Sequence, residues 1–262
     1  MGLTPLWRLR AADGDGAVDA ANIAASAPAV VDNPKRESAD GRIAAPREPL
    51  MPVAATARVN DSPATVSPVA GGAPQIAALD WPALEETILA CRACPLCERR
   101  TQAVPGVGDR GARWMFVGEG PGAEEDRRGE PFVGQAGKLL DNMLAALGLK
   151  RGEDVYIANA VKCRPPHNRT PEAAEIAACL PYLDRQIKLV RPRLLIALGR
   201  PAAQALLGRE ISIAAARGKR FEHAGVAVTV TYHPAYLLRN PLDKGKAWED
   251  LCFARRLMAE GN

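Results

Sequence analysis

Glycines and carboxylates are concentrated in one stretch of the chain, Gly118–Gly134, and this combination indicates a ligand site. The stretch begins Gly118-Glu-Gly-Pro-Gly122, where the missing side chains let a flat ligand approach the main chain closely. Three carboxylates follow in a row at residues 124–126. Because they would repel an anion, the stretch is not a simple phosphate cradle of the kind that holds a nucleoside triphosphate. We therefore expect a different ligand here.

Cysteines form a second group that could do chemistry. The sequence Cys91-Arg-Ala-Cys94-Pro-Leu-Cys97 places three thiols close together, and Cys163 and Cys179 follow farther along. Thiolates hold either zinc or an iron–sulfur cluster, and the spacing alone does not distinguish the two. A third interpretation, a set of reduced core cysteines, is disfavoured by the arginines around the first pair. Cys252 lies on the apolar face of the last predicted helix, and we interpret it as a core residue.

Short apolar runs separated by helical patterns must position these groups. Strands are predicted at residues 114–117, 155–161, 194–198 and 225–232, and helices at 80–91, 138–147, 170–188, 201–207 and 246–258. Strands that alternate with helices favour a parallel sheet covered on both faces. The sequence therefore predicts a three-layer α/β/α fold around a mainly parallel four-stranded sheet. The stretch Gly118–Gly134 would lie at the carboxyl edge of that sheet, where α/β proteins bind ligands.

The first 79 residues differ in composition from the rest. Ala, Pro, Gly, Ser and Asp dominate there, and no apolar periodicity persists. Such a segment cannot bury enough apolar surface to offset its ordering entropy. We predict that residues 1–79 form a disordered linker and that residues 80–262 form the folded domain. The amphipathic patch Leu6–Arg10 is interpreted either as a sticky chain end or as a docking peptide for a partner.

Charge and hydropathy restrict the class of protein. Over the 262 residues Lys and Arg outnumber Asp and Glu by 34 to 30, and the excess lies in residues 80–262. This mild basic bias is compatible with nucleic-acid binding without establishing it. No apolar run approaches the ~18 residues of a membrane span, and no signal peptide pattern is present. We expect a cytoplasmic protein without membrane contact. In the reducing cytoplasm, clustered cysteines bind metal more often than they form disulfides.

Five motifs occur in an order and at intervals that resemble a known family. They are Cys91-x-x-Cys94, Gly118–Gly122, Gly129–Gly134, Asn159–Arg169 and His233–Arg239. On these motifs the chain is similar to the family 4 uracil-DNA glycosylases, the iron–sulfur branch of the uracil-DNA glycosylase superfamily. The resemblance covers roughly residues 83–258. It implies an enzyme of base excision repair that hydrolyses the N-glycosidic bond of flipped-out uracil and leaves an abasic site, without a lyase step.

The resemblance also implies a cofactor. One [4Fe–4S] cluster would be held by Cys91, Cys94, Cys163 and Cys179. Cys97 falls where members of the family need not carry a cysteine, and we interpret it as a non-ligand. The cluster would tie the N-terminal helix to the helix after the second strand, which is a structural rather than a catalytic role.

Residues that match the family's substrate positions would hold the flipped base. Phe132 offers a flat face for stacking. Asn159 carries a donor and an acceptor on one amide, which can bond uracil O4 and N3–H, whereas cytosine presents the reverse pattern. Gly120 stands where better-known members of the superfamily have an Asp. Glu125 is expected either to contact water or to crowd the position of the thymine methyl group.

The departing uracil gathers negative charge, and water must add to the sugar. Family analogy gives the first task to His233, a neutral imidazole that would donate to uracil O2. Because Gly120 replaces the usual water-activating carboxylate, the resemblance points to Glu119 as the group that orients the water. Asn168 is a further polar group expected in the catalytic site.

Contacts to DNA are expected from the segment Tyr236–Arg239 and from nearby cations. The segment fits a wedge that fills the gap left by the flipped base, with Leu237 as its apolar side chain. Arg239, Arg217 and Lys219 are expected to hold phosphates, which predicts binding that weakens steeply with salt. The expected partner is uracil-containing DNA, single- or double-stranded, bound by a monomer. The N-terminal segment would recruit a repair or replication partner.

Three other interpretations remain open from the sequence. One is a superfamily member that binds uracil-DNA without catalysis, or traps it covalently through a histidine in an inserted basic loop. Here Pro165-Pro-His-Asn-Arg169 occupies that place without an insertion, which favours turnover. The others are a zinc-stabilised scaffold and a nucleotide-binding α/β enzyme, and the missing P-loop lysine disfavours the latter.

Overall fold

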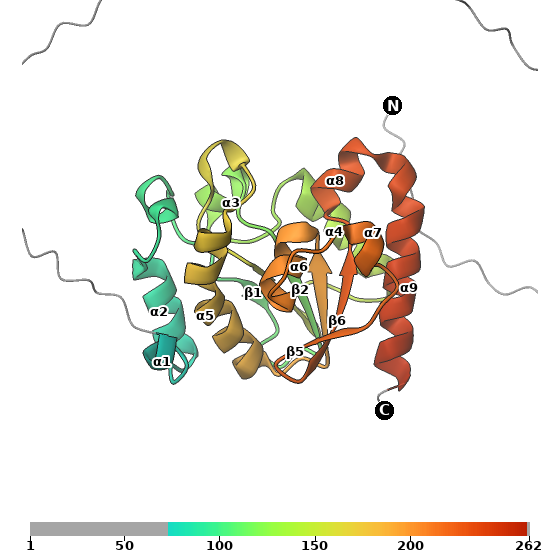
Figure 1. Ribbon diagram of the computed structural model, residues 1–262, viewed down its shortest axis with the longest axis horizontal. Helices are drawn as coiled ribbons and strands as arrows, with labels where there is room; N and C mark the ends of the chain where they lie inside the picture. Colours follow the sequence, from blue (N-terminus) through green and yellow to red (C-terminus); the bar gives the residue numbers. More distant parts are fainter. Residues whose placement is uncertain (1–72, 261–262) are drawn as a thin grey trace, which may run out of the picture. The chain divides into compact units, whose positions relative to one another are not determined.

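The computed structural model describes residues 73–260, whose arrangement Figure 1 shows. The predictions for residues 1–72, including the patch Leu6–Arg10, lie outside the described residues. The end of the predicted linker is described, and it contains the short helix α1 (Ala73–Ile76). Ile76 is buried in the core, so the packed region begins before Asp80. Between residues 73 and 260 no helix combines the length and apolar character that crossing a bilayer needs.

A six-stranded sheet with the order β1-β3-β2-β4-β6-β5 forms the middle layer. Its strands are β1 (Val107–Gly108), β2 (Trp114–Gly118), β3 (Val155–Asn159), β4 (Leu194–Leu198), β5 (Phe221–His223) and β6 (Val226–Thr231). The four inner strands are parallel and are the four predicted ones. Strands β1 and β5, which pair antiparallel at the two edges, were not predicted from the sequence. Both are very short and only partly buried, so neither has the apolar run that marks a strand.

Helices cover both faces of the sheet, and β2 shows how the two faces are separated. Trp114 and Phe116 pack into one hydrophobic cluster, whereas Met115 and Val117 pack into the other. This alternation follows the two-residue period of a strand. The first cluster includes buried residues of α4 (Gln135–Ala146) and α9 (Lys244–Glu260). The second includes those of α2 (Trp81–Ala90), α5 (Ala173–Val190) and α6 (Arg200–Leu207), and Figure 1 shows α5 and α9 on opposite sides of the sheet. The three-layer α/β/α prediction is confirmed.

Capping residues set several helix boundaries. Asp80 caps α2 by accepting a hydrogen bond from the Ala83 N–H at 3.1 Å, as the sequence predicted. Gly208 ends α6 in the left-handed conformation. The remaining short helices are η1 (Pro95–Glu98), α3 (Ala123–Arg128), η2 (Pro166–Asn168), α7 (Ile213–Ala216), α8 (Pro234–Arg239) and η3 (Pro241–Asp243).

The carboxyl ends of the four parallel strands meet at one edge of the sheet. β2 ends at Gly118 and β3 ends at Asn159, which are paired in register. β4 leads into Gly199 and α6, and β6 leads into His233 and α8. This edge therefore gathers the motifs that sequence analysis singled out.

Candidate active site and cysteine cavity

A cleft of about 590 Å³ lies at this carboxyl edge and receives residues from the loops after all four parallel strands. All of the predicted substrate and catalytic residues line it, together with the predicted DNA contact Arg239: Glu119, Gly120, Glu125, Phe132, Asn159, Asn168 and His233. Three predicted DNA-binding residues do not line it: Leu237, Arg217 and Lys219. Arg200 and Tyr232 also line the cleft and were not predicted from the sequence. Each directly follows a parallel strand or its terminal glycine, and that position was the available signal.

The side chain of Asn159 is buried and incompletely bonded. The residue is 2% exposed, and its Oδ1 is the one buried side-chain nitrogen or oxygen within residues 73–260 that lacks a hydrogen-bond partner. A Cβ at Gly118 would lie 2.4 Å from this oxygen and 2.5 Å from Cζ of Phe132. Glycine is therefore required where the two side chains meet over the strand end. An unpaired buried carbonyl oxygen costs roughly 1–3 kcal/mol, a cost that a ligand N–H would remove.

Phe132 forms part of the cleft wall in an unusual backbone conformation. Its φ is 56°, in the left-handed region that residues other than glycine seldom adopt. The ring is buried, and its centroid lies 5.5 Å from that of the His233 ring with an interplanar angle of 31°. Phe132 and His233 are thus far apart in the sequence and share one wall of the cleft.

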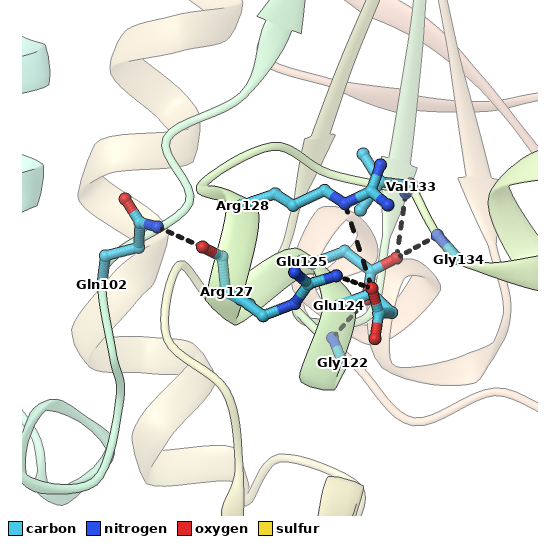
Figure 2. A network of polar contacts seen from close by, with 8 residues as sticks. All are labelled: Gln102, Gly122, Glu124, Glu125, Arg127, Arg128, Val133 and Gly134. Carbon is cyan, nitrogen blue, oxygen red and sulfur yellow. Dashed lines mark hydrogen bonds and ion pairs between the residues drawn. The ribbon is translucent and has the colours of Figure 1, made fainter.

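Glu125 fastens the loop that carries Phe132, as Figure 2 shows. Its Oε1 accepts hydrogen bonds from the N–H groups of Val133 and Gly134, both at 3.0 Å. Its Oε2 accepts one from the Gly122 N–H at 3.1 Å. The residue belongs to α3, a helix that sequence analysis took for part of a loop. Both carboxylate oxygens are therefore used in shaping the cleft.

His233 is held as a neutral imidazole. It caps α8, and its Nδ1 accepts a hydrogen bond from the Ala235 N–H at 3.1 Å, so the ring proton belongs on Nε2. Burial, reinforced by the positive charge of Arg239, lowers the pKa of His233 from 6.5 to about 4. A Cβ at Gly199 would lie 3.0 Å from Cβ of His233, so Gly199 gives the residue its space.

Glu119 is a half-buried carboxyl group of the cleft. Burial raises its pKa, while a hydrogen bond with the Thr170 side chain and the charges of Arg200 and Arg239 oppose the rise. A carboxylate whose pKa is raised in a cleft is suited to act as a base near neutral pH.

Asn168 lies at the rim of the cleft. It is exposed, its φ is 55°, and its Oδ1 accepts a hydrogen bond from Arg164 Nε at 2.8 Å. The side-chain oxygen is thus already bonded within the protein.

Two of the predicted DNA contacts need correction. Leu237 is fully buried in the core, so it is not free to enter DNA, and the next residue, Leu238, is the 45% exposed one. Arg217 is used inside the protein, because its Nε donates to Asp250 Oδ2 at 2.8 Å and its Nη2 to Glu249 Oε2 at 3.0 Å. Its guanidinium carbon also lies 5.5 Å from the Tyr232 ring centroid. It holds a wall of the cleft rather than a phosphate. Lys219 is exposed outside the cleft.

A separate small cavity collects the cysteines. All four predicted ligands line it, and so does Cys97: Cys91, Cys94, Cys97, Cys163 and Cys179. Three of the sulfur atoms accept N–H groups, from Arg100 Nη1 to Cys163 at 2.8 Å, from Lys162 N to Cys179 at 3.3 Å and from Ala93 N to Cys91 at 3.5 Å. A set of thiols with N–H donors directed at sulfur fits thiolate ligation of a metal group. Among the described residues no three donors converge on a point that could hold a single metal ion.

Lys162 lies between the cavity and the cleft. Its side chain is fully buried, and its Nζ donates to the backbone oxygen of Asn159 at 2.9 Å and to Gln186 Oε1 at 2.6 Å. Burial lowers its pKa to about 8. A residue that lines the cysteine cavity therefore holds the last backbone carbonyl of β3 by a hydrogen bond.

Comparison with known proteins agrees with this geometry. The model of the family described as the uracil DNA glycosylase superfamily matches residues 105–252. The type-4 uracil-DNA glycosylase of Pyrobaculum aerophilum is 49% identical over 181 residues, which cover 66% of this chain and 92% of that protein. The type-4 uracil-DNA glycosylase of Sulfurisphaera tokodaii is 47% identical over 60% of this chain and 76% of its own length. That of Thermotoga maritima is 48% identical over 60% of this chain and 82% of its own length.

Proposed function

The chain belongs to the type-4 family of the uracil DNA glycosylase superfamily, and from this membership and the cleft we infer its reaction. It is a uracil-DNA glycosylase, a hydrolase of DNA repair that cleaves the N-glycosidic bond between uracil and deoxyribose. The observation that carries this conclusion at the site is the buried, unpaired Oδ1 of Asn159 at the bottom of a glycine-lined cleft.

We propose that Asn159 identifies the base. Its Oδ1 would accept the N3–H of uracil, and its Nδ2 would donate to O4. Cytosine has no N3–H and carries an amino group at C4, so it would set donor against donor and acceptor against acceptor. Phe132, beside the same strand end, would stack on the flipped ring. Burial of the site makes a mismatched base costly, because neither polar group could turn to water instead.

His233 would stabilise the departing uracil. The bond from the Ala235 N–H to Nδ1 fixes the tautomer and leaves Nε2–H as the donor for uracil O2. Since the pKa of His233 is about 4, the ring is neutral at physiological pH and donates without giving up its proton. A fixed donor at a developing oxyanion typically lowers the barrier by roughly 3–4 kcal/mol.

Glu119 would orient the attacking water. It lies in the same cleft as Asn159 and His233, and Thr170 holds its carboxylate by a hydrogen bond. As its carboxylate form it also offers a negative charge to the oxocarbenium-like sugar. Asn168 at the rim is the further polar group proposed for this site, whereas Gly120 keeps space open: a Cβ there would lie 2.7 Å from Cγ2 of Val161.

The cleft mouth would bind the DNA strand. Arg200 and Arg239 are both exposed there, come from α6 and α8, and suit two phosphates. Leu238, with the 95% exposed Leu242 on the following turn, replaces Leu237 as the proposed apolar contact with the stack. Lys219 stays a proposed contact farther out. Binding by a monomer, and a repair or replication partner for the segment before residue 73, also remain predictions.

We propose one [4Fe–4S] cluster in the cysteine cavity, with Cys91, Cys94, Cys163 and Cys179 as its ligands. Membership of the type-4 family, the iron–sulfur branch of the superfamily, supports a cluster rather than a single zinc ion. When bound, it supplies a cross-link between the segment after α2, the exit of β3 and α5. Cys97 lines the same cavity and is proposed to remain a free thiol.

The test is a single-turnover assay on a labelled oligonucleotide with one uracil, followed by alkali to cleave abasic sites. Matched strands with thymine or cytosine at the same position are the controls. Alkali-dependent cleavage at uracil alone is the expected result. A protein–DNA adduct that survives denaturing electrophoresis would instead identify a covalent trap. Intact strands after incubation with correctly folded protein would refute glycosylase activity.

A further inference from the structure

Arg151 binds the loop that carries Phe132 from outside the cleft. It lies between α4 and β3, and its side chain is only 21% exposed. Its Nη1 donates to the Pro131 carbonyl at 2.9 Å and its Nη2 to the Phe132 carbonyl at 2.8 Å. Its Nε donates to Asp141 Oδ1 on α4 at 3.0 Å. One planar guanidinium thus joins two successive carbonyls of the loop to a helix.

The Phe132 peptide needs such support. The φ of 56° is unfavourable for a residue with a side chain, and the surrounding structure must maintain it. The Phe132 carbonyl is pressed against α4 so closely that a Cβ at Gly137 would lie 1.7 Å from its oxygen. Gly137 therefore provides the space, and Arg151 provides the hydrogen bond that keeps the oxygen there.

The loop is bonded on two sides with opposite polarity. Glu125 accepts hydrogen bonds from the N–H groups of Val133 and Gly134, whereas Arg151 donates to the carbonyls of Pro131 and Phe132. The carboxylate and the guanidinium belong to different elements, α3 and the loop before β3. Between them they use four backbone groups around the turn that sets the direction of the Phe132 ring.

We propose that Arg151 is a positioning residue for uracil excision, which holds the Phe132 ring over the strand end where the base must stack. This inference rests on the proposed role of the cleft. Arg151 does not line the cleft, so it would act through Phe132 alone. Loss of its hydrogen bonds would free the peptide to leave the left-handed conformation and would displace the ring.

A double-mutant cycle on the full chain tests this. The proteins are wild type, Arg151→Gln, Phe132→Ala and the double variant, with Arg151→Lys as the conservative change. Arg113→Gln is the matched control. The Nε of Arg113 also donates to a carboxylate, Asp154 Oδ2 at 2.8 Å, but Arg113 does not line the cleft. Each is measured by single-turnover excision of uracil, thermal unfolding and hydrogen exchange of the amides of residues 129–134, of which Pro131 carries no N–H.

Arg151→Gln is expected to slow excision about 10- to 100-fold in the wild-type background, the scale of a misplaced contact group. In the Phe132→Ala background it should slow excision less than about twofold, because the group through which it acts is gone. Arg151→Lys should lie between, since an ammonium group cannot serve two carbonyls and a carboxylate in one plane. Exchange at residues 129–134 should quicken in Arg151→Gln and not in Arg113→Gln.

Equal slowing by Arg151→Gln in both backgrounds would overturn the proposal, as would unchanged exchange at residues 129–134. A loss of activity matched by Arg113→Gln at the same loss of thermal stability would also overturn it, because the effect would then be general destabilisation. If the wild-type protein does not excise uracil, the proposed function fails, and the exchange measurement still decides whether Arg151 holds the loop.

Discussion

The cleft and the cysteine cavity both adjoin the end of β3, yet they differ in whether their buried polar atoms have hydrogen-bond partners. In the cleft, Asn159 keeps a buried oxygen unpaired. In the cavity, the sulfurs of Cys91, Cys163 and Cys179 all accept N–H groups, and buried Lys162 has two acceptors. A site for a transient ligand must leave bonds unmade until the ligand arrives, whereas a site for a permanent group does not. Variants in the cleft should therefore change rate, and variants in the cavity should change stability.

The largest effect on rate is expected from Asn159→Asp. A carboxylate cannot donate to uracil O4 and repels it, so single-turnover excision should fall roughly 1000-fold or more. The substitution also places a carboxylate at a 2% exposed position, so some loss of thermal stability is expected and excision is compared at equal amounts of folded protein. Asn142→Asp on the exposed face of α4 is the matched control and should retain full activity. Undiminished excision by Asn159→Asp would remove the residue from base recognition.

Glu119→Gln should slow excision roughly 100-fold through loss of the group that orients water. The pH dependence gives a second signature. Because burial raises the pKa of Glu119, the wild-type rate should fall on acidification at a higher pH than an ordinary glutamate would cause, as the carboxylate takes up its proton. The variant should lack this acid limb. Glu124→Gln, exposed and ion-paired to Arg127, is the control. An acid limb that persists in Glu119→Gln would assign the titration to another group.

On the cavity side, Cys179→Ser should remove the visible absorbance of an iron–sulfur cluster and lower the unfolding midpoint by roughly 10 °C or more. Excision by the protein that remains folded should stay within about tenfold of wild type, since no cleft residue changes. Cys97→Ser is the internal control, because Cys97 lines the same cavity and is proposed not to be a ligand. Bleaching by Cys97→Ser would contradict the ligand set.

The smallest expected effect is a pH dependence of stability that belongs to the cleft. His233 has a pKa of about 4 in the folded protein against 6.5 ordinarily, so between these values the unfolded chain binds the proton and the folded protein does not. The free energy of unfolding should therefore fall by about 2 kcal/mol from pH 7 to pH 5 on account of this residue. Urea unfolding of wild type and His233→Gln at both pH values isolates the contribution. If the free energy of unfolding changed equally between pH 7 and pH 5 in both proteins, the pKa of His233 would be the same in the folded and unfolded states.

Sequence alone predicted the four parallel strands and placed Asn159 and His233 at their ends, because strands and their exits are encoded locally by apolar runs. It failed where a partner lies far away. From the sequence Arg217 was predicted to be a cation available to DNA, but its Nε donates a hydrogen bond to Asp250 on the last helix. Leu237 and Leu238 are equally apolar, and only the packing of α8 decides which is buried.

The Phe132 loop shows the same limit. The glycines around α3 resemble a loop, and nothing near Glu125 in sequence indicates that its carboxylate closes onto Val133 and Gly134. Arg151 is more distant still, in a segment between a helix and a strand without any motif. The residues proposed to touch the base could be found by family motif, whereas the residues that hold them in place required coordinates.

The short segment from Asn159 to Cys163 also fixes the length of the chain at this point. The Ala160 N–H donates to the Gly118 carbonyl, and the Val161 N–H donates to the Glu119 carbonyl. The Lys162 N–H donates to Cys179 Sγ, and the Lys162 carbonyl accepts a hydrogen bond from the Val104 N–H. Adding or deleting one residue here would displace both the Asn159 amide, proposed to recognise the base, and Cys163, proposed as a cluster ligand. The interval between Asn159 and Cys163 therefore has to stay constant for the geometry of either site to survive.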